Sequence, residues 1–265
     1  MLQATMATTL TASTLRQSKP AESSCGPAPA ESRAIGHLLS CPRVWCGAGF
    51  SSIVLSLVVL CVPNARAQTA LMNGTNAAGT LLASHTNSCT LTASTGDNIV
   101  LRLGTTGFNG NLNLYGPTGA FLKTAASGTD AALDYSATNS GTFTAQVTSY
   151  SAGGSGTYVL HLAQFPEAFV VPAGNEGGPM TNGGNHAGTI TLGDLDMWSF
   201  TANAGYNIVL RLGAVGFYGN LELYGPNGAL LKTSATFYDA ELDYTATNSG
   251  TFATLPSLSV SGHPS

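Results

Sequence analysis

Two aspartates, Asp194 and Asp196, form the pattern in this chain that is best suited to site chemistry. They alternate at the entrance of a predicted strand, so their carboxylates project to one face. Carboxylate oxygens are hard ligands of the kind that calcium prefers, and a calcium site takes roughly six to eight oxygens. Asp239 and Asp243 are therefore candidate additional donors. Calcium is the one candidate cofactor, and the alternative is that these aspartates are solvated turn carboxylates.

Aromatic residues near glycine turns supply a second kind of candidate site. Phe108, Tyr115, Tyr218 and Tyr224 are the candidate ligand-binding residues, because exposed rings stack on sugars or peptides. The alternative is that most of them belong to the core, since the Leu-x-Leu-Tyr alternation buries part of each strand.

Catalytic motifs are not found in the sequence. It contains no His-Glu-x-x-His zinc motif, no Gly-x-Ser-x-Gly elbow and no phosphate-binding glycine loop before a helix. The many Gly-Thr and Ser-Gly pairs are typical of turns. We therefore expect a protein that is not an enzyme.

The elements that position these residues occur twice. Residues 73–143 align without a gap with residues 182–252, at an offset of 109 positions and with about 60% identity. The chain is therefore two copies of one domain, and any site can be checked against its counterpart. His85 and Asn87 of the first copy stand where the second has its two alternating aspartates, which argues against a shared calcium site.

Charged residues that recur in both copies have a structural explanation. The recurring pairs are Asp130 and Asp239, Asp134 and Asp243, Arg102 and Arg211, and Lys123 and Lys232. We expect an Arg–Asp pair that ties neighbouring strands. Repetition indicates that the fold retains these residues and does not by itself assign them chemistry.

Each copy consists of short alternating segments separated by Gly, Pro and Asn. In 98–103, for example, Ile99, Leu101 and Leu103 point one way while Val100 and Arg102 point the other. Such period-two patterns predict antiparallel strands. The predicted fold is all-β, with two tandem jelly-roll-like antiparallel β-sandwich domains after an N-terminal signal segment.

The predicted domain boundaries follow composition. Residues 1–67 form a signal peptide with a long, disordered n-region: a run of about thirteen mostly apolar residues, 50–62, precedes the cleavage pattern Ala65-Arg66-Ala67. Repeat 1 spans 68–164 and a Pro/Gly linker spans 165–179. In the linker, Phe169 and Val170 are expected to pack against a domain. Repeat 2 spans 180–265.

The second copy diverges from the first after Phe252. It has no counterpart of Tyr158, Leu160 and Leu162, so repeat 2 is expected to lack its last strand. Fully burying such side chains contributes about 1.5–3 kcal/mol each. We therefore expect repeat 2 to be of marginal stability, and the chain to be a fragment of a longer repeat protein.

Charge restricts the partners. From residue 68 onward the chain has four basic and eleven acidic residues, a net charge of about −7. This argues against nucleic acid, whose phosphates need a basic surface. The predicted mature chain has one cysteine, Cys89, and no transmembrane segment.

Four motifs in the same order resemble the bacterial pre-peptidase C-terminal domain: Asp-Leu-Asp-Met-Trp-Ser-Phe at 194–200, Leu-Tyr-Gly-Pro-x-Gly, Asn-Ser-Gly-Thr-Phe and Gly-Thr-Tyr-Val-Leu at 156–160. The resemblance covers both copies. It implies a small jelly-roll-like sandwich that acts as an accessory module of exported bacterial proteins, some of which bind calcium or insoluble polymers.

The functional expectation follows from these points together. We expect a secreted or cell-surface, non-catalytic module that binds an extracellular polymer, such as a polysaccharide or a protein, or a cell-surface component. The alternative is a structural spacer or an export and maturation domain with no ligand of its own.

Overall fold

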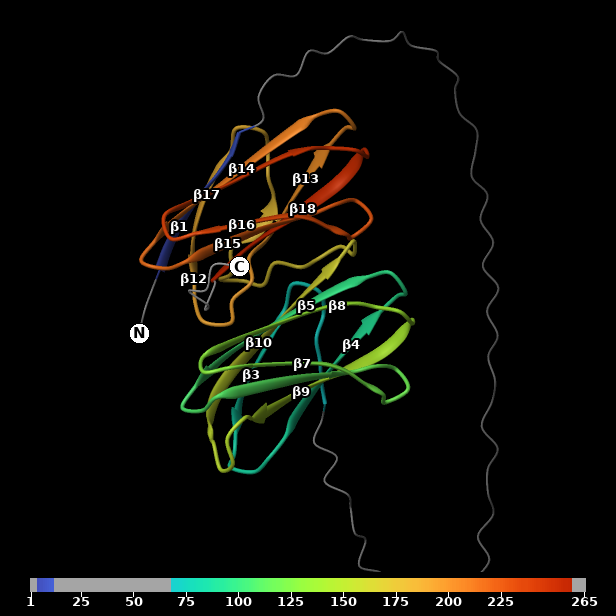
Figure 1. Cartoon of the computed structure of the whole chain (residues 1–265), viewed down its shortest axis with the longest axis vertical. Helices are drawn as coiled ribbons and strands as arrows, with labels where there is room; N and C mark the ends of the chain where they lie inside the picture. The colour runs from blue at the N-terminus through green and yellow to red at the C-terminus, as the bar shows by residue number, and fades with distance from the viewer. Residues whose placement is uncertain (1–3, 12–67, 259–265) are drawn as a thin grey trace, which may run out of the picture. The chain divides into compact units, whose positions relative to one another are not determined.

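The computed structural model describes residues 4–11 and 68–258, which form β-strands, turns and loops but no helix. The strands make two β-sandwiches, green and orange-red in Figure 1. Within the described ranges there is thus no helix that could span a membrane. The predicted all-β fold is confirmed.

Repeat 1 is a sandwich of a five-stranded and a four-stranded sheet. Its strands are β2 (Thr69–Ala70), β3 (Asn76–Leu81), β4 (Asn87–Ala93), β5 (Asn98–Thr106), β6 (Gly110–Tyr115), β7 (Phe121–Ser127), β8 (Asp130–Ser136), β9 (Gly141–Ser149) and β10 (Gly156–Phe165). The sheet orders are β2-β4-β9-β6-β7 and β3-β10-β5-β8. Successive strands alternate between the two sheets, as in a jelly roll, except at the β6–β7 hairpin, whose two strands pair within one sheet.

Repeat 2 has the same arrangement. Its strands are β11 (Gly177–Pro179), β12 (Asn185–Ile190), β13 (Met197–Ala202), β14 (Asn207–Val215), β15 (Gly219–Tyr224), β16 (Leu230–Thr236), β17 (Asp239–Thr245) and β18 (Gly250–Leu258). The sheet orders are β11-β13-β18-β15-β16 and β12-β1-β14-β17. Strand β1 (Ala4–Thr11) therefore holds the sheet position that β10 holds in repeat 1.

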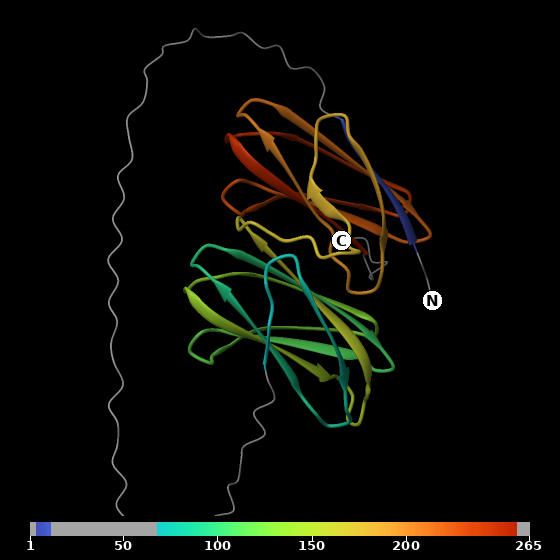
Figure 2. The same cartoon turned by 180° about the vertical axis from the view of Figure 1, so that it is seen from behind.

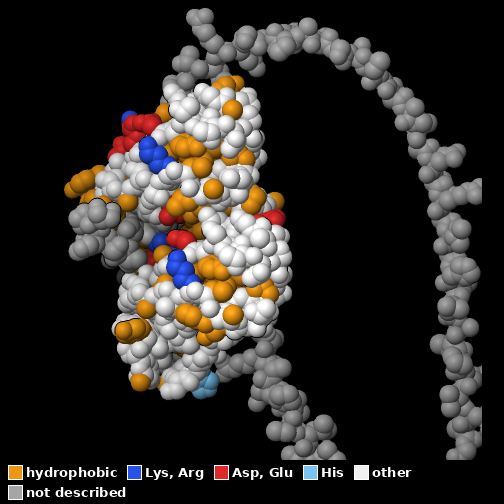
Figure 3. All heavy atoms as spheres, turned by 45° about the vertical axis from the view of Figure 1, so that its right-hand side comes forward, with side chains coloured by type: hydrophobic (Ala, Val, Ile, Leu, Met, Phe, Trp, Pro, Cys, Tyr) orange, Lys and Arg blue, Asp and Glu red, His pale blue; other side chains and the backbone are white. Residues whose placement is uncertain are grey.

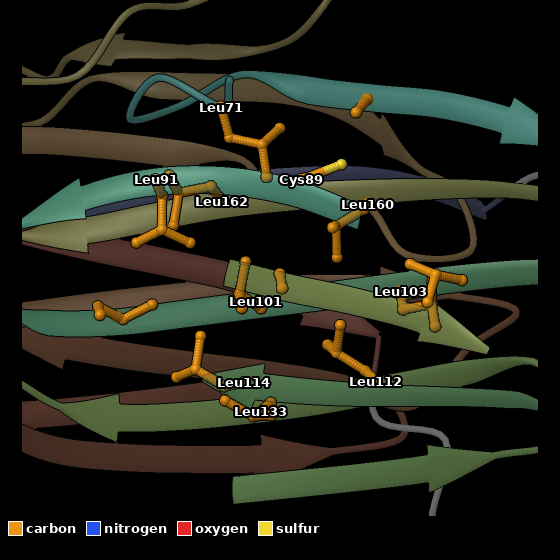
Figure 4. Close-up of a cluster of buried hydrophobic side chains, with 14 of the residues drawn as sticks. Leu71, Cys89, Leu91, Leu101, Leu103, Leu112, Leu114, Leu133, Leu160 and Leu162 are labelled. Carbon is orange, nitrogen blue, oxygen red and sulfur yellow. The ribbon is translucent and has the colours of Figure 1, made fainter. Parts of the chain in front are cut away.

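Alternation of apolar residues explains the core of each sandwich. Ile99, Leu101 and Leu103 of β5 are fully buried, as predicted. In Figure 4, leucines of the two facing sheets, among them Leu101 and Leu112, point into the same core. Each such burial stabilises the fold by about 1.5–3 kcal/mol.

The segment between the repeats is held against repeat 1. The Asn73 side-chain amide donates hydrogen bonds to the carbonyls of Gln164 (2.7 Å) and Ala168 (3.2 Å). Phe169 packs against a buried cluster, as predicted, whereas the Val170 side chain is about half exposed. This segment is therefore a tied connection and not a freely swinging linker.

The N-terminal region departs from the predicted disordered n-region at residues 4–11, which form β1. The blue strand lies beside repeat 2 in both views (Figures 1 and 2). The apolar run and the cleavage pattern lie within 12–67, outside the described residues, as does 259–265, where the divergent second copy continues. The signal peptide, the domain boundaries and the missing last strand stay predictions.

Candidate functional site

Two strands with the same sequence, one in each repeat, are buried to different extents. β5 and β14 share the sequence Asn-Ile-Val-Leu-Arg-Leu-Gly. Val100 and Arg102 of β5 are buried, although alternation places them on the outer face. Their counterparts are not: Val209 is only partly buried and the Arg211 side chain is 49% exposed. The outer face of β5 is covered because repeat 2 packs on it.

Two glycines allow the close approach of the repeats. A Cβ atom at Gly104 would collide with the Leu192 carbonyl and lie 2.8 Å from the Gly193 nitrogen, and one at Gly193 would lie 2.6 Å from the Gly104 Cα. Gly193 also has φ = 77°, in the left-handed region that favours glycine. Both positions therefore need glycine for the loop of repeat 2 to meet the strand of repeat 1.

A buried ion pair lies at this contact. The Arg102 guanidinium donates to the Asp130 carboxylate (3.1 Å) and to the Leu258 carbonyl of repeat 2. Asp130 also accepts from the Gly193 backbone amide (3.4 Å). Burial raises the pKa of Asp130, and Arg102 opposes that shift. The predicted Arg–Asp pair is confirmed here, whereas in repeat 2 Arg211 pairs with Glu241.

Asp194 caps its own turn and faces repeat 1. Its carboxylate accepts a hydrogen bond from the Leu195 amide (3.0 Å), and it lies 3.4 Å from Nδ1 of His161. Burial lowers the pKa of His161 to about 4, against the opposing pull of Asp130. The His161 ring is therefore neutral at pH 7, and its contact with Asp194 is not an ion pair.

Asp196 is the most unusual of these carboxylates. Its side chain is fully buried, and neither carboxylate oxygen has a hydrogen-bond partner. Burial, helped by the negative charges of Asp194 and Glu176, raises the pKa of Asp196 to about 8. At pH 7 Asp196 is therefore mainly a neutral acid, since an unpaired buried charge costs more than protonation.

The four predicted calcium ligands are not gathered in one place. Asp239 and Asp243 lie exposed on β17, at the opposite edge of the four-stranded sheet from β12, whereas Asp194 and Asp196 follow β12. Across residues 68–258, no group of three or more His, Cys, Asp or Glu side chains is arranged to hold a metal ion. Calcium binding stays a prediction.

Two of the predicted ligand-binding aromatics are core residues. Phe108 is buried in repeat 1. Tyr224 is buried between the repeats, where its ring stacks on Phe165 at 4.0 Å. Its hydroxyl donates to the Glu222 carboxylate (2.8 Å). Tyr115 is partly buried and meets the exposed Phe121 edge-on at 5.8 Å.

The fourth, Tyr218, is partly buried and lies beside exposed residues, in a group that we call the aromatic patch: Val215, Tyr218, Phe237 and Tyr238. Phe237 is 49% exposed and Tyr238 is 75% exposed. The Tyr218 and Phe237 ring centroids are 6.5 Å apart, and those of Phe237 and Tyr238 are 5.1 Å apart. The patch joins the turn after β14 to the turn after β16.

The patch is specific to repeat 2. At the same four positions repeat 1 has small or polar residues: Thr106, Asn109, Gly128 and Thr129. The framework strands on either side are nearly identical, so these differences are concentrated at one surface. Proximity to a glycine turn predicted Tyr218 but not Phe237 and Tyr238, which stand out only when the two copies are compared position by position.

No family model matches the chain, and no curated protein matches it. Among solved structures, the chain is similar to the pre-peptidase C-terminal domain of a collagenase from Bacillus anthracis. That match has 21% sequence identity and a TM-score of 0.32, and it covers 36% of this chain and 93% of the other.

Proposed function

We propose that this chain is a secreted or cell-surface, non-catalytic module whose repeat 2 binds an extracellular polymer, a polysaccharide or a protein, through the aromatic patch. The observation that carries the proposal is the difference between the copies. Two sandwiches with the same framework differ at four adjacent surface positions, and only repeat 2 has rings there.

The physical argument rests on exposed apolar rings. A solvent-exposed aromatic group costs free energy in water that a ligand recovers by covering it. Truncation of one such contact residue typically weakens binding by about 1–2 kcal/mol, which is about 5- to 30-fold in Kd. Phe237 and Tyr238 meet at an interplanar angle of 80°, so the patch is a ridged surface that suits a single polymer strand better than a flat crystalline face.

Charged side chains also lie near the patch, since the exposed Asp239 directly follows Tyr238 in the sequence. Figure 3 shows one face of the molecule, on which hydrophobic side chains gather in several places and charged side chains form a few groups between them. With a net charge of about −7 from residue 68 onward, long-range attraction favours neutral or basic polymers. The predicted signal segment and the motifs resembling the pre-peptidase C-terminal domain support an extracellular location.

The test is retention of the full chain on collagen, amorphous chitin and amorphous cellulose, in which single polymer strands are accessible. The variants carry the repeat 1 residues, Tyr218→Asn, Phe237→Gly and Tyr238→Thr, so each replacement is one that the same framework already accommodates. Tyr150→Ser is the matched control, because Tyr150 is 73% exposed but lies outside the patch. We expect retention on at least one polymer, reduced about tenfold by Tyr238→Thr and unchanged by Tyr150→Ser.

Two outcomes would contradict the proposal. Retention that is insensitive to all three patch variants would place the binding surface elsewhere. No retention on any of the three polymers would favour the alternative, in which the repeats are structural spacers or export and maturation domains.

A further inference from the structure

The position of β1 in repeat 2 identifies a strand-sized slot. In repeat 1, β10 lies between β3 and β5 and supplies Tyr158, Leu160 and Leu162 to the core. In repeat 2, the corresponding position between β12 and β14 is held by residues 4–11, which are far away in the sequence. A strand from outside the repeat thus completes its sheet.

The register of β1 is that of the strand it replaces. In repeat 1, Thr157 faces Thr106. In repeat 2, Thr5 faces Val215, which is the counterpart of Thr106. The register of β1 against β12 likewise matches the register of β10 against β3. β1 is antiparallel to both of its neighbours, as β10 is. Residues 4–11 therefore occupy the positions of residues 156–163 one for one.

We propose that repeat 2 is a strand acceptor: the slot between β12 and β14 binds an extended peptide strand, and residues 4–11 are the occupant in this chain. Each side of the slot is a sheet edge, whose backbone N–H and C=O groups hydrogen-bond to an added strand. Inward-facing apolar side chains line it, including the fully buried Leu210 and Leu212.

The chemistry of the ligand follows from the slot. It is a segment of about eight residues without proline, because both edges need backbone partners. Small or apolar side chains stand at every second position, as in β10. Cleavage after Ala67, which the sequence predicts, would separate β1 from repeat 2 and leave the slot to a strand of this pattern from another chain.

The first test perturbs β1 in the full chain. Thr8 lies in mid-strand, opposite His186 and Leu212. Thr8→Pro removes a backbone donor, whereas the control Thr8→Val is nearly isosteric and keeps it. Amide hydrogen exchange of β12 and β14 is expected to accelerate at least tenfold in Thr8→Pro, with Thr8→Val like the wild type. β3 and β5 of repeat 1 serve as the internal reference.

The second test adds the ligand. A fluorescein-labelled peptide of residues 156–165, Gly-Thr-Tyr-Val-Leu-His-Leu-Ala-Gln-Phe, is expected to bind the Thr8→Pro chain at least tenfold more tightly than the wild type, by fluorescence anisotropy. It is also expected to restore the protection of β12 and β14. The same peptide with Leu160→Pro is the control ligand and should not bind.

A second variant keeps the test decisive should Thr8→Pro fail to fold. A protease site introduced within 40–46 allows residues 4–11 to be cut from the chain after folding, and the labelled peptide then competes with the released segment. Unchanged exchange in β12 and β14 after Thr8→Pro or after cutting and removal of the segment would overturn the proposal. So would faster exchange that the peptide fails to reverse.

Discussion

Asp196 makes the stability of this protein depend on pH in a direction opposite to that of an ordinary ion-paired aspartate. Its pKa rises from 3.8 to about 8 on folding, first because it is buried and then because Asp194 and Glu176 lie nearby. Between pH 3.8 and about 8, the Asp196 carboxyl is therefore protonated in the folded state and ionised in the unfolded state. The stabilisation is therefore complete below the unfolded pKa and is lost as pH rises through about 8.

The magnitude follows from the slope of stability with pH. Between the two pKa values of Asp196, each pH unit costs about 1.4 kcal/mol of unfolding free energy. His161 opposes this effect at lower pH: its pKa falls to about 4 on folding, so its contribution is present above about 6.5 and is lost as pH falls toward 4. Between pH 6.5 and 8, Asp196 is therefore expected to contribute a loss of about 2 kcal/mol of unfolding free energy.

The assay is urea denaturation followed by tryptophan fluorescence at pH 6.5, 7 and 8, since Trp198 is buried two residues from Asp196. Asp196→Asn is the matched variant, because an amide has nearly the shape of the protonated acid and does not titrate. We expect the wild type to lose about 2 kcal/mol relative to this variant across the interval. Parallel curves for the two proteins would refute the reasoning, because Asp196 would then be ionised in the folded state at pH 6.5.

Three further predictions concern the contact between the repeats and the calcium hypothesis. Arg102→Met leaves Asp130 buried without its partner and is expected to lower the free energy of unfolding by about 3 kcal/mol or more. Arg211→Met removes a half-exposed pair and is expected to lower it by less than about 1 kcal/mol. Equal losses of the two variants in urea unfolding would contradict the buried contact. Gly104→Ala places a Cβ against the Leu192 carbonyl oxygen and should cost about 1–3 kcal/mol, with faster amide exchange in 192–197. Gly213→Ala, at the matching position of β14, is its control, and an equal effect of the two would show that backbone strain alone is responsible. The calcium hypothesis from the sequence predicts that millimolar calcium raises the melting temperature through Asp194 and Asp196 and that Asp196→Asn abolishes the rise. An unchanged melting temperature in the wild type would refute that hypothesis.

Local patterning was enough to predict the strands of both sandwiches. Ile99, Leu101 and Leu103 alternate with residues of the other face, and the structure buries all three. This works because strand side chains have a strict period of two and each sandwich has one core. Recurrence of the charged residues also predicted an Arg–Asp pair between neighbouring strands, and the structure forms it between Arg102 of β5 and Asp130 of β8.

Burial of the outer face of β5 could not be predicted in this way. Val100 and Val209 have identical sequence neighbours within their strands, yet only Val100 is fully buried. The difference arises from the packing of the Gly193 loop on Gly104, a contact between residues that are far apart in the sequence. Periodicity within a strand carries no information about a second domain that covers it.

The pair Asp194 and Asp196 illustrates how one pattern supports two explanations. Repeat 1 has His85 and Asn87 in place of these aspartates, which argues against a shared calcium site. The structure adds a packing explanation, because this loop of repeat 2 docks on repeat 1 through Gly193, Leu195 and Met197. The matching segment of repeat 1, which contains His85, is exposed. The two aspartates therefore distinguish a docked loop from an undocked one, whether or not a cation binds.

The two features specific to repeat 2 meet along one strand of its sheet. Val215, at the end of β14, belongs to the aromatic patch and is also the residue that faces Thr5 of β1. A strand that enters or leaves the slot would thus change the border of the patch. If polymer binding depended on strand occupancy, Thr8→Pro would weaken polymer retention and the peptide of residues 156–165 would restore it. If the two sites are independent, Thr8→Pro would change amide exchange in β12 and β14 and leave polymer retention unchanged. This one variant therefore distinguishes two coupled sites from two independent sites that share strand β14.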